Sequence, residues 1–518
     1  MKIARSSTMA WLMTQCIALL VTAPILHVRA AGGGAEQQKV RPAAVAGAFY
    51  PADPKELSQM IDDMLAKATP PAVDGQILAA VAPHAGYPYS GPVAAWTFAT
   101  LKGHKYSRVV VIAPSHYVPF DFTSVYDGDA YTTPLGTIPV DKEFAQRLVK
   151  MSSTIQLSDK GHQATQDAPE HSVEVELPWL QKVLGQFELV PIVMGDQSYE
   201  SSRALGVALA KMLKNDHDTL VLASSDLSHY HPYDEAETID HKTLHALEAW
   251  DYFSMSRNFE TRVWEACGGA PIVAAMIYAE RLGANKAEVL KYANSGDTTG
   301  DHSRVVGYSA DLFVKSAHAA DAVPPFSLTD QEKTALLGVA RKSTEYAVHT
   351  NRLYDPPASA SETLNREYGA FVTLTESGLL RGCIGYTSPM KPLYLTVRDT
   401  AAYAALKDPR FEPVSVAELS SLEYEISVLS PLRRVRDVEQ IKVGRDGLVM
   451  KNADAEGLLL PQVPVEQKWD RQTFLEETCR KAGMDPNCWK DENTDIFSFT
   501  AVVFNEKDRE QGNKGARE

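Results

Sequence analysis

The sequence predicts an α/β protein in which an open, mostly parallel sheet flanked by helices is followed by a second, smaller α+β domain. Three short, uniformly apolar runs in the first half end near His84, His116 and Asp226, and each is bounded by Pro, Gly or Ser. Such runs are typical of buried strands in a parallel sheet. Helical patterns alternate with strand-like runs up to about residue 315, as expected for βαβ units.

The first domain is expected to span residues 40–315, after a flexible leader at 31–39. Apolar residues recur at helical spacing between the strand-like runs. These patterns predict helices at 54–68, 92–101, 142–151, 173–184, 201–213 and 234–249.

A shift in composition separates the second half from the first. Residues 316–329 are rich in Ala, Asp and Pro, with Pro324-Pro325 at the centre, which indicates a linker. The second domain is expected over residues 330–505, and the charged, Gly-containing segment 506–518 has the composition of a disordered tail. Within the second domain the patterns predict a helix at 330–350 and strands at 369–375, 422–429 and 496–504.

The bulk composition argues against a nucleic-acid partner. The 518 residues carry a formal net charge of −15, and the pI is about 5.5. Phosphate backbones are bound by clustered Lys and Arg, which this chain lacks. An unknown small-molecule or protein substrate, or a metal, is therefore the expected partner.

The N-terminal 30 residues have the architecture of a secretory signal peptide. Lys2 and Arg5 precede an apolar stretch from Met9 to Val21, and small residues follow before Ala30. We expect cleavage near Ala30 and a periplasmic or extracellular protein that has no membrane segment after cleavage. The alternatives are an uncleaved membrane anchor, for which the stretch is short, and a cytoplasmic location if the segment is not a signal.

Four cysteines lie outside the predicted signal. Cys479 and Cys488 are close enough in sequence to pair, and export would permit a disulfide. Sequence proximity does not decide whether they form one, because a disulfide requires a specific geometry.

Histidines follow the carboxyl ends of the predicted strands, where ligands of open α/β sheets bind. His84 and His116 would supply two imidazoles, which is half of a transition-metal site. Cys267 lies in a Gly-rich turn that enters an apolar helix, and a helix N-terminus lowers the pKa of a thiol. The three together predict a site for iron(II) or copper, with zinc as a further possibility.

Three more residues are candidates for proton transfer beside this site. Asp226 and His229 follow the third apolar run, where a carboxylate can orient an imidazole and a second imidazole can move protons. His171 opens a helical pattern and could face the same crevice. Asp297 and His302 belong to a polar loop that is either part of the site or a capped turn.

Residues 40–315 resemble the MEMO family. The ordered motifs that carry this resemblance are Arg41-Pro42-Ala43-Ala44-Val45-Ala46-Gly47-Ala48-Phe49-Tyr50-Pro51, Pro83-His84-Ala85-Gly86-Tyr87, Pro114-Ser115-His116, Glu170-His171-Ser172, Ser224-Ser225-Asp226-Leu227-Ser228-His229 and Cys267-Gly268. The resemblance implies a fold similar to class III extradiol dioxygenases. It also implies binding of iron or copper by His84, His116 and Cys267, with metal-dependent redox activity. Eukaryotic members of the family are described as adaptors for phosphotyrosine peptides.

The second half is similar to the AMMECR1 family over about residues 330–504. Its signature appears as Leu380-Arg381-Gly382-Cys383-Ile384-Gly385. Arg381 would favour a thiolate at Cys383 if the two side chains converged, and the alternative is a buried structural cysteine. Fusion of the two modules resembles the AmmeMemoRadiSam system and implies a radical-SAM partner protein. The chain has no Cys-x₃-Cys-x₂-Cys motif, so it would not hold that partner's cluster itself.

Two functions from different classes fit the sequence. The leading expectation is a dioxygenase-like oxidoreductase that uses iron or copper at His84, His116 and Cys267, with protons handled by Asp226, His229 and His171. The alternative is a non-catalytic module that binds a peptide, an anion or a metal in the same crevice.

Overall fold

The computed structural model describes residues 38–317, 326–387 and 391–506. The predicted signal peptide at 1–30, nearly all of the predicted leader and tail, and most of the predicted linker lie outside these residues. None of the helices in the described ranges is long and apolar enough to cross a membrane.

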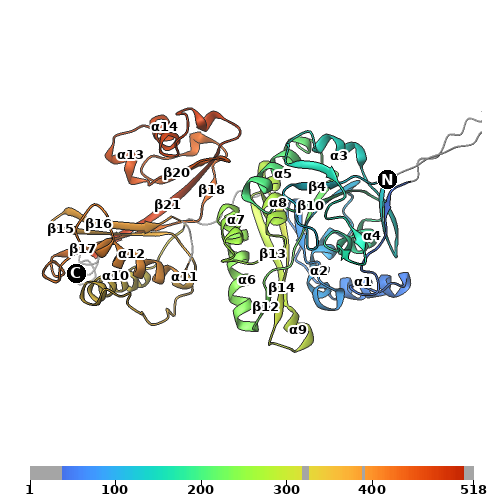
Figure 1. Ribbon diagram of the computed structural model, residues 1–518, viewed down its shortest axis with the longest axis horizontal. Helices are drawn as coiled ribbons and strands as arrows, with labels where there is room; N and C mark the ends of the chain where they lie inside the picture. Colours follow the sequence, from blue (N-terminus) through green and yellow to red (C-terminus); the bar gives the residue numbers. More distant parts are fainter. Residues whose placement is uncertain (1–37, 318–325, 388–390, 507–518) are drawn as a thin grey trace, which may run out of the picture. The chain divides into compact units, whose positions relative to one another are not determined.

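The first half contains a mixed sheet whose strands follow the order β12-β14-β2-β11-β3-β10-β4-β7, with β13 paired to β14 (Figure 1). The four strands β2, β11, β3 and β10 are parallel, whereas β14 joins β2, and β4 joins β10, in antiparallel fashion. The expectation of a mostly parallel sheet therefore holds at the centre but not at the edges. The strands are β2 Gln76–Ala82, β3 Arg108–Pro114, β4 Thr123–Tyr126, β7 Ile155–Ser158, β10 Glu188–Met194, β11 Thr219–Ser224, β12 His229–His231, β13 Lys286–Asn294 and β14 Val305–Lys315.

Helices cover both faces of this sheet, which explains why its central strands are apolar at nearly every position. Val81 faces one core cluster, together with Leu205 of α5 and Val273 of α8. Its neighbour Ala80 faces a second cluster, together with Trp179 of α4. The helices of this half are α1 Pro54–Lys67, α2 Tyr87–Leu101, α3 Lys142–Leu148, α4 Leu177–Leu184, α5 Tyr199–Met212, α6 Tyr233–Glu248, α7 Tyr252–Glu260, α8 Gly269–Arg281 and α9 Ser295–Thr299.

Three predicted helices differ from those observed by at least three residues at one end, and the one expected at 142–151 ends at Leu148. The helix expected at 92–101 begins at Tyr87, because Pro88 occupies the first turn, where a missing N–H is tolerated. Pro92 then lies inside the helix. The helix expected at 173–184 begins with a short 3₁₀ turn at Glu174–Glu176, and α4 proper starts at Leu177. Small strands complete this half: β1 Val40–Arg41, β5 Ala130–Thr133 and β6 Gly136–Pro139 in one sheet, and β8 Ala164–Thr165 with β9 Ala168–Pro169.

The second half contains a separate sheet in the order β16-β15-β17-β21-β19-β20, with β18 paired to β21. Helix α10 spans Asp330–Thr350 as predicted, and Thr329 and Glu332 cap its N-terminus reciprocally. The remaining elements are α11 Glu362–Asn365, β15 Ala370–Glu376, β16 Leu379–Tyr386, α12 Leu393–Leu406, β17 Leu422–Leu429, β18 Arg433–Arg434, β19 Asp446–Lys451, β20 Glu456–Leu459, α13 Gln462–Glu466, α14 Arg471–Lys481 and β21 Asp495–Asn505.

The structure pairs Cys479 with Cys488, which the sequence alone left undecided. Their Cα atoms lie 5.9 Å apart, within the range of ordinary disulfides. Cys267 and Cys383 are free.

Candidate functional site

Three adjacent parallel strands each place a site residue two positions beyond their last residue. Strand β2 ends at Ala82, β11 at Ser224 and β3 at Pro114. Because the carboxyl ends of these strands lie at the same edge, His84, Asp226 and His116 are brought into one crevice. The ring centroids of His84 and His116 are 5.1 Å apart.

Five side chains offer metal-ligating atoms at this edge, in two sets that share His84. One set joins His84 to His116 and His171, and the other joins His84 to Asp226 and Cys267. Within each set the ligand atoms lie within 4.8 Å of one another. His84 is thus next to both of its predicted partners, His116 and Cys267, but each partner belongs to a different set.

His84 is held as a neutral imidazole with its Nε2 atom facing Cys267. Its Nδ1 lies 2.8 Å from the hydroxyl of Ser224, which in turn donates to the carbonyl of Ser172 or to Glu176. The hydroxyl proton is committed there, so Nδ1–H of His84 is the donor and Nε2 keeps its lone pair. Burial, together with the neighbouring His116, lowers the pKa of His84 well below its usual range. This is the protonation state that binds metals.

His116 is oriented by a carboxylate. Its Nδ1 lies 3.0 Å from Oε1 of Glu170, and its backbone N–H donates to Oε2 at 2.7 Å. Burial alone would raise the pKa of Glu170, but the hydrogen bonds from His116 outweigh it and lower the pKa to about 2. An ionised carboxylate only accepts, so Nδ1 of His116 carries the proton and Nε2 is free to coordinate. Carboxylates orient histidine ligands in this way at metal sites.

His171 lies beside the other two histidines. Its ring is 4.6 Å from that of His116 and 4.5 Å from that of Phe49. Burial, with a smaller effect of His116, lowers the pKa of His171 to about 4. Its buried Nδ1 makes no hydrogen bond of normal geometry with any described residue. This nitrogen lies 3.8 Å from Oε1 of Glu170, and a buried atom without a hydrogen bond is a candidate ligand atom.

Asp226 acts on the backbone rather than on an imidazole. Its Oδ1 accepts the N–H groups of His84 at 2.9 Å and of Ala85 at 3.3 Å. The expected hydrogen bond from Asp226 to a ring is therefore not found, and Glu170 and Ser224 orient the two imidazoles instead. Burial raises the pKa of Asp226 to about 6.

Cys267 points into the site, but its thiol has the opposite pKa shift from the one predicted. Its Sγ lies 3.2 Å from Nε2 of His84 and accepts the N–H of Asp226 at 3.2 Å. The sequence predicted a lowered pKa from the N-terminus of the following helix. Burial and the nearby Asp226 carboxylate raise it instead, because both disfavour the thiolate.

His229 lies at the rim of the site without joining either set of ligands. Its Nδ1 is 2.8 Å from the carbonyl of Leu227, so Nδ1–H donates to that oxygen. The sequence allowed Asp297 and His302 to be either part of the site or a capped turn. The structure shows the capped turn. Asp297 caps the N-terminus of α9, and His302 stacks on Tyr233 with ring centroids 4.3 Å apart.

In the second half, the guanidinium of Arg381 is engaged away from the thiol of Cys383. It donates to Glu418 at 2.7 Å and to the carbonyl of Glu412 at 2.8 Å. The thiol accepts from Thr373 at 3.3 Å, and the N–H of Cys383 donates to Asp408. The condition that Arg381 and Cys383 converge is therefore not met, because Arg381 is committed to an ion pair.

Sequence reasoning assigned no role to several residues that build the site. Arg41 is buried, donates to Glu174 at 2.6 Å, and also donates to the carbonyl of Glu170. It therefore fixes the segment that carries His171. The only sequence signal was that Arg41, Glu170 and Ser224 fall in motifs that carry the resemblance to the MEMO family.

Two protein families match successive regions of this chain. The family model described as Memo-like protein matches residues 41–312, and the AMMECR1 model matches residues 337–504. A MEMO1 family protein of Methanopyrus kandleri is 38% identical over 283 residues, which cover 53% of this chain and 98% of that protein. Protein PH0010 of Pyrococcus horikoshii is 41% identical over 192 residues, covering 35% of this chain and 93% of that protein. A crystal structure of PH0010 aligns with a TM-score of 0.33 and covers 35% of this chain and 94% of its own.

Proposed function

Since this chain belongs to the Memo-like protein family and carries an AMMECR1 domain after the Memo domain, we propose that it is a metal-dependent oxidoreductase. The metal would be iron or copper, held by His84, His116 and Cys267, and the chemistry would be dioxygenase-like. The observation that carries this proposal is that two imidazole Nε2 atoms with free lone pairs and one sulfur lie at the same strand ends.

One pair of the proposed donor atoms, on His84 and Cys267, has the spacing of two ligands of one transition metal, whereas His116 and Cys267 belong to different ligand sets. The separation of 3.2 Å between Nε2 of His84 and Sγ of Cys267 is close to the ~3.5 Å between nitrogen and sulfur ligands of one tetrahedral ion. The raised pKa of Cys267 makes its deprotonation more costly, but a coordinating metal displaces the thiol proton, which leaves to solvent or to a nearby base. Soft sulfur with imidazole suits copper(I) and iron(II), and zinc is the competitor.

A bound iron or copper ion would supply a Lewis acid and a one-electron redox couple. The chain's own groups would position and protonate the substrate. Glu170 and Ser224 keep the proton on Nδ1 of His116 and His84. Asp226 Oδ2, with a pKa near neutrality, would hold or release a proton inside the site. His229 would exchange protons at the rim, and His171 would do so beside His116.

Metal analysis of the intact protein tests this proposal. The mature chain would be purified without a chelating resin, and bound iron, copper and zinc would be measured by mass spectrometry. We expect about one redox metal per chain, oxygen uptake with ascorbate, and at least a tenfold loss of metal affinity in Cys267→Ser. Cys383→Ser is the matched control, because this free cysteine lies in the other half.

Three results would contradict the proposal. Zinc alone, without oxygen uptake, would favour a hydrolase. Metal-free protein that binds a peptide or anion would favour the binding module. Equal metal content in Cys267→Ser and the unaltered protein would show that the sulfur of Cys267 is not a metal ligand.

We also propose that the protein is exported. The signal-like N-terminus motivates this, and a disulfide between Cys479 and Cys488 suits an oxidising compartment. Fractionation of a C-terminally tagged full-length protein, with N-terminal sequencing, tests it. Intact Met1 on a cytoplasmic protein would overturn it.

A further inference from the structure

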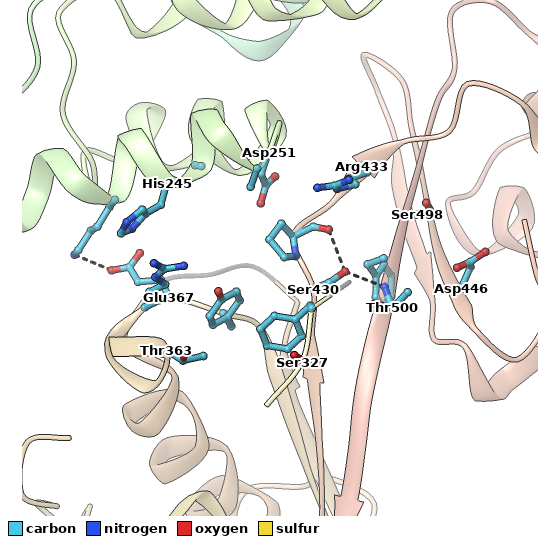
Figure 2. Close-up of a pocket in the computed structure, with 18 of the residues that line it drawn as sticks. His245, Asp251, Ser327, Thr363, Glu367, Ser430, Arg433, Asp446, Ser498 and Thr500 are labelled. Carbon is cyan, nitrogen blue, oxygen red and sulfur yellow. Dashed lines mark hydrogen bonds and ion pairs between the residues drawn. The ribbon is translucent and has the colours of Figure 1, made fainter. Parts of the chain in front are cut away.

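A cavity apart from the candidate metal site is lined by residues of both halves of the chain (Figure 2). Its volume is about 640 Å³, which is within the usual size of small-molecule sites. His245 and Asp251 reach it from the segment of α6 and α7, and Arg433 and Thr500 reach it from strands of the second half. None of the five candidate metal ligands lines it.

Aromatic side chains form much of the apolar wall. Trp264, Phe326, Tyr368 and Phe499 all line the cavity. The indole N–H of Trp264 is already bonded to Glu367 at 2.8 Å, so the ring offers its apolar surface rather than a donor. Such a wall suits the flat body of an aromatic ligand.

Most charges at the cavity are already paired. Asp251 caps the N-terminus of α7 by accepting from Ser254. Burial, with help from the nearby Arg366, lowers the pKa of His245, so this residue is neutral near pH 7. The remaining pairs are Lys242 with Glu367 at 2.7 Å, Arg445 with Asp446 at 2.6 Å, and Arg366 with Glu362 at 2.5 Å.

Arg433 is the exception. It lines the cavity and is half-buried, yet its guanidinium makes no hydrogen bond and no ion pair with any described residue. A guanidinium has five N–H donors in a planar fork that matches a carboxylate. The nearest acids, Asp251 and Glu280, contribute only longer-range attraction.

We propose that this cavity binds a small aromatic carboxylate, with the carboxylate on Arg433 and the ring against the aromatic wall. A single unpaired cation near Asp251 and Glu280 favours a monoanion over a doubly charged phosphate. The inference is independent of the metal site, and since both halves supply the lining, the site would exist only in the fused chain.

Calorimetric titration of the full chain with 2-naphthoate tests this proposal, with 2-naphthamide as the neutral analogue. We expect saturable 1:1 binding of the acid that is at least about tenfold tighter than that of the amide, since the difference is one charge-assisted contact. Arg433→Gln should remove this preference and leave amide binding unchanged. Retained amide binding also shows that the variant has kept its fold.

Two further variants complete the test. Ala249 lines the cavity just after the C-terminus of α6. Ala249→Phe would fill the cavity with a larger side chain and should abolish binding of both compounds. Arg352→Gln, an exposed arginine outside the cavity, should change neither. The proposal is overturned by equal affinities for acid and amide, by unchanged acid binding in Arg433→Gln or Ala249→Phe, or by no saturable binding of the acid at millimolar concentration.

Discussion

The Nε2 atom of His84 lies 3.2 Å from the Sγ atom of Cys267, although 183 residues separate them in the chain. The contact exists because β2 and the turn before α8 both end at the same edge of the sheet. It leaves an imidazole lone pair beside a thiol, with His116 on the other side of His84.

Ser224→Ala should weaken metal binding without removing a ligand. The change takes away the acceptor for Nδ1–H of His84, so the tautomer with a free Nε2 is no longer enforced. Loss of such a partner typically lowers metal affinity by about 10- to 100-fold. Competition titration with a chromophoric chelator measures it. Ser202→Ala, which removes a buried hydroxyl on α5, should leave the affinity unchanged.

Arg41→Met should destabilise the fold strongly. Arg41 is 4% exposed, and its loss would leave the buried carboxylate of Glu174 without its cation. Breaking a buried ion pair from one side costs about 3 to 5 kcal/mol. Urea denaturation should show this loss. The double change Arg41→Met with Glu174→Met should restore part of it, and additive losses would contradict the account.

Ionisation of Asp311 should cost the folded protein stability as the pH rises from 5 to 8. Burial raises the pKa of Asp311 to about 7. The folded state therefore keeps a proton that the unfolded state loses near pH 4, and the penalty for ionisation grows until the pH passes about 7. The full effect is up to about 4 kcal/mol. The melting temperature of Asp311→Asn relative to the unaltered protein should therefore increase from pH 5 to pH 8, whereas that of the exposed Asp454→Asn should stay constant.

Chain entropy predicts that the Cys479–Cys488 disulfide contributes about 2.5 kcal/mol to the stability of the second half, given a sequence separation of nine positions. Denaturation with and without dithiothreitol should show this difference, and the double change of both cysteines to Ala should abolish it. Thiol titration of the unfolded, metal-free mature protein should count two free cysteines, Cys267 and Cys383. Four free thiols in protein isolated without reductant would contradict the disulfide.

The sequence predicted the parts of the fold that depend on local pattern. Continuous apolar runs identified β2, β3 and β11, and the capped, periodic segment Asp330–Thr350 became α10. The sequence did not predict the antiparallel strands at the edges of the sheet, because the direction of a strand depends on how β14 folds back onto β2. Apolar pattern alone carries no information about that pairing.

The convergence of the candidate ligands followed from strand ends, but their hydrogen-bond partners did not. Glu170 reaches His116 across 54 residues, and Ser224 reaches His84 across 140. Such contacts are set by tertiary packing. The pKa of Cys267 was predicted in the wrong direction for a related reason: the helix N-terminus is visible in the sequence, whereas burial beside Asp226 is not.

X-ray absorption at the metal edge tests the central claim most directly. Protein loaded with iron(II) or copper(I) should show one sulfur at about 2.3 Å together with nitrogen ligands near 2 Å. Cys267→Ser should lose the sulfur and keep the nitrogens. A shell of nitrogen and oxygen alone in the unaltered protein would contradict the account, because the metal would then be bound without Cys267.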